Sequence, residues 1–501
     1  MKSNRSDAQA SEQNTQEIDE YDVIVVGGGA VGENAAQYAI AGSEMSAVII
    51  ERELVGGECS YWACMPSKAL LTPGDVLHHA QNVPGVASLL DANSVDVDAT
   101  LARRETFTNG LDDSSQVDWA QGIGIDVLRG HARLTAEREV EVDGRIVRAR
   151  RAVVLATGSH ASIAPIEGLD AALPWTSRDA TNVHEVPQRL AIIGGGVVAC
   201  EAATWFASFG TQVTLLVRDD RLLQNVAKFA AEAVLDGLRS AGVDVQLGTS
   251  PSRVTREAPE STGYGRIHGG PVTITSTRGT DGGYVVEVDE VLAATGRAAS
   301  TDDLGLGVVG LTDLSSSHGF IPVDDAMRVL GVQGDWLFAV GDVNGRALLT
   351  HQGKYQARVC GDVIAASALG ESLQGARYVA AADHDAVPQV IFTRPEVASV
   401  GRSEAALHEA GYDVRCVRLS MAVAGTAVQR DDDAGTAELL VDERTRVVLA
   451  ATFVGPGAGN QLYPATIAVT AGLTVEQLWQ AVPAYPTPSE VWLRLCEKAR
   501  T

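Results

Sequence analysis

The most informative stretch of this 501-residue chain is Gly56-Gly57-Glu58-Cys59-Ser60-Tyr61-Trp62-Ala63-Cys64-Met65-Pro66-Ser67-Lys68. In it, two cysteines lie five positions apart after a pair of glycines. On an undistorted helix the two Cα atoms would lie about 8.7 Å apart. A disulfide needs about 4.4–6.8 Å between Cα atoms, so these cysteines can bridge only where the backbone is bent. We therefore expect a disulfide that opens and closes rather than a structural one.

The two cysteines alone leave other interpretations open. They could be half of a zinc site, although no second Cys/His pair at ligand spacing occurs nearby. They could also be two unrelated buried thiols, since free cysteine is among the most buried residue types. The flanking residues have to decide between these interpretations.

A dinucleotide-binding pattern precedes the cysteines. The apolar run Tyr21-Asp22-Val23-Ile24-Val25-Val26 predicts a buried parallel strand, and Gly27-Gly28-Gly29-Ala30-Val31-Gly32 follows it as G-x-G-x-x-G. Gly27 permits the tight turn, Gly29 lets a pyrophosphate approach the backbone, and Gly32 lets the following helix pack on the strand. Ala47-Val48-Ile49-Ile50 predicts the next strand, and Glu51 at its end suits ribose hydroxyls. The alternative is a flexible glycine loop.

A second copy of the pattern begins at Arg189-Leu190-Ala191-Ile192-Ile193. Gly194-Gly195-Gly196-Val197-Val198-Ala199 reads G-x-G-x-x-A, and a helix is predicted from Cys200 to Phe209. The next predicted strand, 212–217, ends in Val217 where an NAD site would place a carboxylate. Arg218 follows with a guanidinium suited to a 2′-phosphate, which favours NADPH over NADH. The alternative is that Arg218 only pairs with Asp219 or Asp220 on the surface.

The cysteine segment, Gly56-Gly57-x-Cys-x4-Cys-x-Pro-Ser-Lys, resembles the redox-active segment of the flavoprotein disulfide reductases, the family of lipoamide dehydrogenase, glutathione reductase and mercuric reductase. The resemblance runs from about residue 21 to about residue 492. It implies an α/β fold with two Rossmann-like dinucleotide-binding domains and a C-terminal α+β interface domain that forms a homodimer with shared active sites. The implied division is a disordered tail at 1–20, an FAD-binding domain at 21–172 and 298–383, an NAD(P)-binding domain at 173–297, and the interface domain at 384–501.

The resemblance also implies roles for single residues. Cys64 would be the thiol next to the flavin and Cys59 the thiol that meets the substrate. Without the resemblance, Lys68 could be an ordinary surface lysine; the resemblance implies that it pairs with Glu201. Asp342 would bind the flavin ribityl chain rather than cap a helix. The implied FAD contacts are Gly27, Gly29, Ala30, Gly32, Glu51, Gly57, Lys68, Thr157, Gly158, Gly341 and Asp342; the implied NADPH contacts are Gly194, Gly196, Ala199, Arg218, Arg221 and Gly296.

The C-terminal part departs from the family pattern. The segment 387–401 resembles the first strand of the interface domain, and the usual ending His-Pro-Thr-x-x-Glu appears as Tyr485-Pro486-Thr487-Pro488-Ser489-Glu490. Glu490 is kept, but Tyr485 replaces the acid/base histidine, and no histidine follows His408. A phenol with a pKa of about 10 can donate a proton but is a poor base at neutral pH. Mercuric reductase also has tyrosine here, yet its tail ends in paired cysteines, whereas this chain has only Cys496.

Composition limits the class of protein. The formal net charge is −25, which argues against binding to nucleic acid or anionic membranes. Six cysteines in 501 residues do not make a secreted disulfide framework, so we expect a cytoplasmic protein. Residues 1–20 lack the apolar core of a signal peptide, and no run of 18 apolar residues predicts a membrane span. We expect no bound metal.

The sequence thus predicts an FAD- and NADPH-dependent enzyme that reduces Cys59–Cys64 and then an unidentified acceptor. Two alternatives stay open. One is a quinone, oxygen or metal-ion reductase that works from the flavin with the disulfide as a bystander; the other is a redox subunit with little turnover. Tyr61 and Trp62, between the cysteines, could narrow access to the disulfide or stack on a substrate.

Overall fold

The computed structural model describes residues 19–90, 94–278, 282–431 and 434–501. Most of the predicted N-terminal tail, residues 1–18, lies outside the described residues. The prediction is wrong for Asp19 and Glu20, because the first strand, β1 (Asp19–Val26), already includes them. Asp19 is paired with Val147 and Glu20 with Arg148, so backbone hydrogen bonding to a neighbouring strand extends β1 beyond its apolar run.

The first glycine pattern opens a seven-stranded sheet. β1 lies between β2 (Ala47–Glu51) and β6 (Arg145–Leu155), parallel to both. β3 (Ile125–Arg129) extends the sheet beyond β2, and β5 (Glu139–Val142) and β4 (Ala132–Ala136) continue it in antiparallel fashion beyond β6. β16 (Leu337–Ala339) also pairs with β6, although 181 residues lie between the two strands in the chain. Residues on both sides of the second glycine pattern therefore build one sheet.

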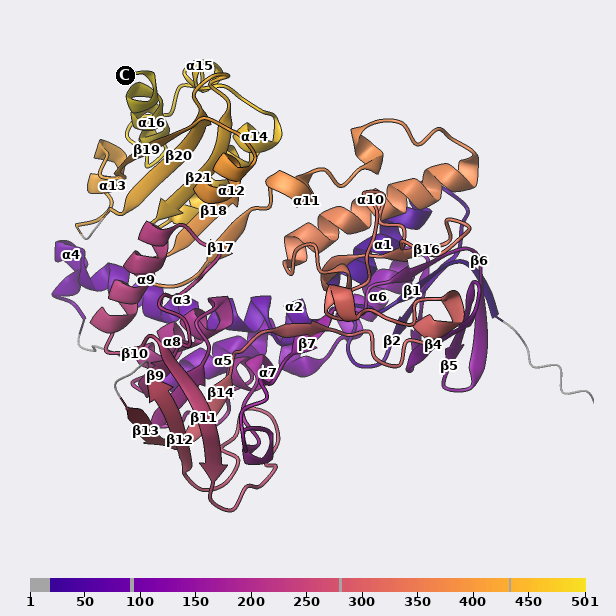
Figure 1. The fold of residues 1–501 in the computed structure, drawn as a ribbon, viewed down its shortest axis with the longest axis horizontal. Helices are drawn as coiled ribbons and strands as arrows, with labels where there is room; N and C mark the ends of the chain where they lie inside the picture. Colours follow the sequence, from indigo (N-terminus) through magenta and orange to yellow (C-terminus); the bar gives the residue numbers. More distant parts are fainter. Residues whose placement is uncertain (1–18, 91–93, 279–281, 432–433) are drawn as a thin grey trace, which may run out of the picture.

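Two helices cover this sheet close to the glycine turn. α1 (Ala30–Ile40) follows the turn directly, and α10 (Thr350–Leu369) packs against it (Figure 1). The two backbones approach closely at Gly361, where an added Cβ would lie 2.5 Å from the Cβ of Tyr38. This contact brings the N-terminus of α10 to the same edge of the sheet as the N-terminus of α1.

The second glycine pattern opens a smaller unit with a parallel sheet of its own. The order of this sheet is β10-β9-β8-β14, with bounds Asp244–Gln246, Gln212–Leu216, Arg189–Ile193 and Glu290–Ala293. The helices α8 (Val197–Ser208) and α9 (Lys228–Ser240) and an antiparallel sheet of β11 (Thr249–Arg256), β12 (Val272–Arg278) and β13 (Gly283–Val288) complete the unit. β7 (Ser159–Ala161) and β15 (Arg297–Ala299) pair where the chain enters and leaves it.

The third unit is an antiparallel sheet in the order β17-β18-β21-β20-β19, with bounds Gln389–Ile391, Val397–Gly401, Val448–Val454, Thr436–Asp442 and Val414–Ser420. The expected single strand over 387–401 is two strands, β17 and β18, which pair with each other. Pro395 lies between them, and a proline cannot donate a ladder hydrogen bond. Helices α14 (Leu462–Thr470) and α16 (Glu490–Arg500) pack on this sheet, next to the shorter α12 (Glu404–Glu409), α13 (Ala424–Ala427) and α15 (Val475–Leu478).

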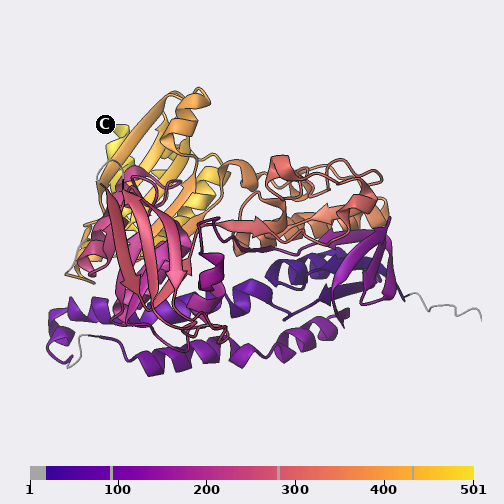
Figure 2. The ribbon, with the colours of Figure 1, turned by 60° about the horizontal axis from the view of Figure 1, so that its bottom comes forward.

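A row of helices connects the first two units, and Figure 2 shows it along the lower edge of the molecule. Its members are α2 (Gly57–Tyr61), α3 (Cys64–Gln81), α4 (Pro84–Ala87), α5 (Val97–Phe107) and α6 (Ser114–Gly122). Leu70 and Leu71 of α3 belong to the apolar core of the second unit, which also includes Val397 and Val454 of the third. The cysteine segment is therefore packed where the three units meet.

Candidate active site

The two cysteines lie on two different helices. Cys59 is in the middle of α2 and Cys64 is the first residue of α3, and both are free thiols. The helix is interrupted at Trp62 and Ala63, whose φ/ψ angles are −133°/0° and −135°/−91°. The backbone is thus bent between the cysteines, as a bridge between them requires.

The surroundings of the two thiols differ. A hydrogen bond from Cys59, the hydroxyl of Thr350 and the charge of Lys68 lower the pKa of Cys64 to about 6. Cys64 Sγ lies 3.3 Å from Thr350 Oγ1. The same hydrogen bond, together with burial, raises the pKa of Cys59. At neutral pH the pair therefore holds a thiolate at Cys64 and a thiol at Cys59.

Lys68 and Glu201 meet although 133 positions separate them. Lys68 Nζ lies 2.8 Å from Glu201 Oε2, and the backbone N–H of Phe392 donates to Glu201 Oε1 at 2.9 Å. The Glu201 side chain is 7% exposed, and the ammonium also lies 4.4 Å from the centre of the Phe392 ring. One ion pair therefore connects α3, α8 and the third unit.

One groove collects most of the residues expected to bind FAD. It is lined by Gly27, Gly29, Ala30, Glu51, Gly57, Thr157, Gly158, Gly341 and Asp342, together with Cys59, Trp62 and Thr350. Gly29 leaves room for a ligand, because the nearest atom to an added Cβ would be Gly57 Cα at 3.9 Å. Gly32 lies outside the lining and instead allows close packing, because its Cβ would come within 1.9 Å of Gly27 O. Of the two cysteines it is Cys59 that lines the groove, while Cys64 reaches it through Thr350.

Polar groups along this groove fit a dinucleotide. Glu51 Oε2 accepts from Gly28 N at 2.7 Å at the end of β2. Burial raises the pKa of Asp342, whose Oδ2 accepts from the hydroxyl of Ser159. Glu58 Oε2 is buried without a hydrogen-bond partner, which leaves an acceptor for a ligand hydroxyl.

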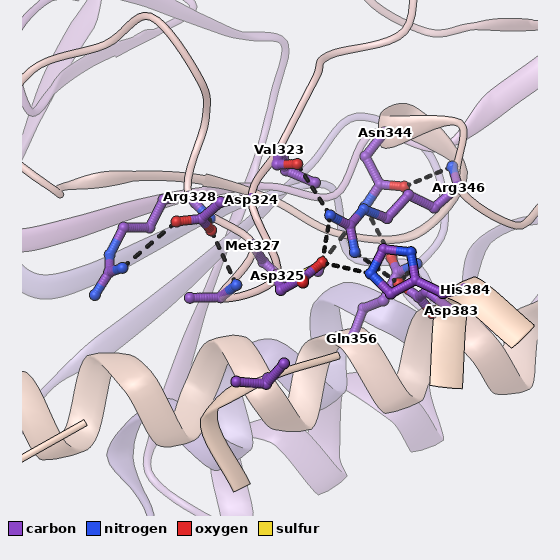
Figure 3. Close-up of polar contacts among 12 residues, drawn as sticks. Val323, Asp324, Asp325, Met327, Arg328, Asn344, Arg346, Gln356, Asp383 and His384 are labelled. Atoms are coloured by element: carbon purple, nitrogen blue, oxygen red, sulfur yellow. Dashed lines mark hydrogen bonds and ion pairs between the residues drawn. The ribbon is translucent and has the colours of Figure 1, made fainter. Parts of the chain in front are cut away.

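A network of polar side chains, of which Figure 3 shows Asn344, Gln356 and Asp383, supports the turn that carries Gly341 and Asp342. Gln356 Oε1 accepts from Gly341 N and from Asn344 Nδ2, both at 2.8 Å, and Gln356 Nε2 donates to Asp383 Oδ2 at 3.0 Å. Asp383 lies on α11 (Ala382–Asp385) and also pairs with Arg346 at 3.4 Å. Asp342 does not cap a long helix, because its own turn, Gly341–Asn344, is a short 3-10 helix.

The second glycine turn has the same open geometry as the first. Gly194 has φ of +135° and packs against Ala294 O, while a Cβ on Gly196 would meet no atom within 4 Å. Ala199 is buried in α8, and Gly296 has φ of +139° just before β15. Two arginines follow β9. Arg218 is 81% exposed and lies 3.4 Å from Asp219, the surface pairing considered as an alternative, and Arg221 donates to Gln224 Oε1 at 3.0 Å.

Tyr485 and Glu490 lie in the third unit, and neither lines the groove. The Tyr485 side chain is 75% exposed. Glu490 is buried at the first position of α16, where Oε1 binds Arg494 Nη2 at 2.7 Å and Oε2 has no hydrogen-bond partner. Within one chain the structure therefore does not bring Tyr485 to the cysteines.

The side chains near the cysteines include two aromatic residues noted in the sequence and others that have no signal there. Tyr61 and Trp62 are 1% and 6% exposed, so Tyr61 is a core residue and not a stacking surface. Arg178 lies over the Trp62 ring at 4.1 Å. Burial raises the pKa of Glu33 on α1 to about 7. Thr350 is 286 residues from Cys64, and only the packing of α10 brings them together.

The described residues contain neither a metal-binding cluster nor a membrane-spanning helix. Among them, no group of three or more His, Cys, Asp or Glu side chains could hold a metal ion. No helix within the same residues is both long and apolar enough to cross a bilayer.

The chain is similar to known proteins in sequence and in fold. Residues 21–358 match the family model described as pyridine nucleotide-disulphide oxidoreductase, and residues 387–496 match the dimerisation domain of that family. A mercuric reductase from Lysinibacillus sphaericus is 30% identical over 94% of this chain and 81% of its own length. A dihydrolipoyl dehydrogenase from Chlamydia pneumoniae is 31% identical over 94% and 95%. The structure is similar to the Cu(II) complex of the HOCl-induced flavoprotein disulfide reductase RclA from Escherichia coli, with a TM-score of 0.79, 23% identity and coverage of 96% and 99%.

Proposed function

The chain belongs to the pyridine nucleotide-disulphide oxidoreductase family and is an oxidoreductase of the disulfide reductase type, so we propose that it carries electrons from NADPH to Cys59–Cys64 and on to an external acceptor. The observation that carries this proposal is a pair of cysteines with different thiol pKa values beside a groove that fits a dinucleotide. The family is FAD-dependent and uses NAD(P)H.

We assign the groove of Gly27, Gly29, Glu51 and Asp342 to FAD. The open face of Gly29 and the N-terminus of α1 suit the pyrophosphate, and Glu51, Glu58 and Asp342 supply acceptors for ribose and ribityl hydroxyls. When bound, FAD supplies a two-electron carrier between the nicotinamide and the disulfide. Thr350, at the N-terminus of α10, lines the same groove and contacts Cys64.

The two cysteines have different roles in the reaction, because one is a thiol and the other a thiolate. Reduction of the disulfide takes up two electrons, and one proton is retained when the product is a Cys59 thiol and a Cys64 thiolate. Cys59 attacks the acceptor after it loses its proton, and Cys64 then closes the disulfide again. Lys68 and the N-terminus of α3 stabilise the thiolate of Cys64.

We further propose a cytoplasmic homodimer in which Tyr485 and Glu490 of one subunit complete the active site of the other. The matched dimerisation domain, the exposure of Tyr485 and its absence from the groove of its own chain support this arrangement. Tyr485 can donate a proton to a departing thiolate but is a poor base for Cys59. Exchange with lipoamide or glutathione disulfide is therefore expected to be slow.

NADPH is the preferred donor in this proposal. Val217 replaces the carboxylate that would hold a 2′-hydroxyl, and the guanidinium of Arg218 is free to leave Asp219 because the ion pair is exposed. Arg221 stands close by in the same loop.

Arg218→Ala is expected to lower kcat/KM for NADPH about tenfold, since one charge-assisted contact to the 2′-phosphate contributes about 1.5–3 kcal/mol and this one is exposed. The value for NADH is expected to stay unchanged. Steady-state kinetics with both nucleotides measure this, with Arg239→Ala on the last turn of α9 as a matched control. An equal loss with both nucleotides would contradict the assignment.

An anaerobic titration of the holoenzyme with NADPH tests the proposed electron path. We expect uptake of two equivalents, with a long-wavelength band from the Cys64 thiolate beside the flavin after the first, because disulfide and flavin each take two electrons. Thiol alkylation after the first equivalent checks that Cys59 and Cys64 have become reactive. Uptake of one equivalent with no such band would remove the cysteines from the path.

A second candidate, direct reduction of a quinone, oxygen or a metal ion from the flavin, is favoured by Tyr485. It stands where the family has its acid/base histidine, and no histidine follows His408. The relative named mercuric reductase makes a metal-ion acceptor worth testing, although Cys496, the only cysteine near the C-terminus, is buried. Quinone or metal-ion reduction that survives loss of both Cys59 and Cys64 would favour this candidate. A redox subunit with little turnover would be reduced by NADPH and reoxidised by none of these acceptors.

A further inference from the structure

A single guanidinium holds the short helix that carries Cys59. Arg178 Nε donates to Glu58 Oε1 at 2.6 Å, directly before Cys59 in the chain. The same guanidinium lies 4.1 Å from the centre of the Trp62 ring, directly after α2. Its two terminal nitrogens bind Glu53 at 3.0 and 3.2 Å. Arg178 therefore contacts α2 near both of its ends.

The helix that carries Arg178 is itself anchored. α7 (Ser177–Thr181) begins with a capping box formed by Thr176 and Asp179. Thr181 Oγ1 donates to Trp62 O at 2.9 Å, so α7 also holds the backbone of the redox segment. Arg104, whose side chain is 1% exposed, donates to Thr181 O at 2.7 Å from α5. The helix that carries Arg178 is therefore itself held in place by its neighbours.

Helix α2 depends on such contacts. It has five residues, and helices that short are not stable on their own. The interruption at Trp62 and Ala63 separates it from α3, so the position of Cys59 relative to Cys64 is set by what holds α2 in place. We propose that Arg178, through Glu58 and Trp62, is a positioning residue that sets the reduction potential of the Cys59–Cys64 pair. This inference rests on the proposed function, in which that pair is oxidised and reduced.

The physical basis is the effective concentration of one thiol at the other. A disulfide forms more readily when its two sulfur atoms are held close, because less entropy is lost on closure. In reduction by dithiothreitol near neutral pH, the protein disulfide and the dithiol give a Cys59 thiol, a Cys64 thiolate and one cyclic disulfide. Two electrons pass to the protein, one proton stays on Cys59 and the other is released to solvent. If α2 loosens, closure becomes less favourable, the disulfide becomes easier to reduce, and its potential rises.

The experiment equilibrates the holoenzyme, without NADPH, in mixtures of reduced and oxidised dithiothreitol and counts Cys59 and Cys64 thiols by alkylation and mass spectrometry. Arg178→Gln is expected to raise the equilibrium constant for reduction about three- to tenfold, equivalent to about 14 to 30 mV. Trp62→Leu, which keeps the ion pair with Glu58, is expected to give part of this shift. Arg178→Lys is also expected to give part of it, because an ammonium keeps the charge but cannot bind two carboxylates while lying flat on an indole.

The matched control is Arg189→Gln, since Arg189 also binds two carboxylates, Asp289 at 2.7 Å and Glu287 at 3.3 Å, and is expected to leave the equilibrium unchanged. If Arg178→Gln does not fold, Trp62→Leu decides alone. An unchanged equilibrium in Arg178→Gln or in Trp62→Leu overturns the proposal, and so does a wild-type value in Arg178→Lys, which would make charge the whole effect. A wild-type pair that dithiothreitol reduces but NADPH does not would refute the proposed function and leave the Arg178 result valid.

Discussion

Cys59→Ser is expected to reduce the NADPH-dependent turnover of an aromatic disulfide such as 5,5′-dithiobis(2-nitrobenzoate) by at least about 10³-fold, because the attacking sulfur is lost. Entry of electrons from NADPH does not depend on Cys59, so NADPH should still bleach the flavin. Stopped-flow absorbance for flavin reduction and steady-state assays for turnover separate the two steps.

The same variant isolates the Cys64 thiolate. The serine hydroxyl can still donate to Cys64, and Thr350 and Lys68 remain, so the pKa of Cys64 is expected to stay near 6. Because this pKa lies below its ordinary value, the thiolate is present above pH 6 and is lost as the pH falls through about 6. The long-wavelength band of the oxidised variant should therefore disappear on acidification.

Cys416→Ser is the matched control, since Cys416 is an exposed thiol in the third unit. It should leave both turnover and the spectrum unchanged. Full disulfide turnover in Cys59→Ser would falsify the interchange role of Cys59, and a band that persists well below pH 6 would contradict the identification of its donor as Cys64.

Lys68→Met is expected to destabilise the protein by about 2–3 kcal/mol. It leaves the buried carboxylate of Glu201 with only the N–H of Phe392, and breaking a buried ion pair costs about 3–5 kcal/mol. The loss of stability expected for Lys68→Met is smaller than that for a fully buried pair, because the Lys68 side chain is 35% exposed. Loss of the ammonium should also raise the pKa of Cys64, so the thiolate band should shift toward higher pH.

Urea unfolding followed by flavin fluorescence measures the change in stability. Lys228→Met is the matched control, because Lys228 pairs with Glu232 at 3.7 Å on the surface and should change stability by less than about 0.5 kcal/mol. The double change Lys68→Met with Glu201→Gln should recover part of the loss, since an amide oxygen can still accept from Phe392 N. Equal stability of Lys68→Met and the wild type would show that Glu201 does not need its partner.

Local pattern was sufficient for the elements that carry the nucleotide turns. β1, β2, β8 and β9 appear within two residues of the apolar runs that predicted them, because a buried parallel strand followed by a glycine turn is specified by neighbouring residues. The bend between Cys59 and Cys64 was expected from their spacing once the flanking residues had indicated a disulfide. The segment 387–401 shows the limit, since its apolar residues do not reveal that the chain reverses around Pro395.

The contacts between residues far apart in the sequence could not be derived from local pattern. The pairing of Lys68 with Glu201 was expected only from a family resemblance, and Thr350 beside Cys64 and Arg178 over Trp62 were not expected at all. No local pattern marks a threonine that starts a helix, or an arginine in a short helix, as a neighbour of a cysteine.

The sequence by itself determined that this protein has two dinucleotide units, a bent cysteine pair and a tyrosine in place of the expected histidine, because each of these depends on residues close together in the chain. Tertiary structure alone decided what holds helix α2 and how the Gly341 turn is supported. These depend on packing between α3, α7, α8, α10 and α11, and the distances between side chains on different elements are set by the whole fold.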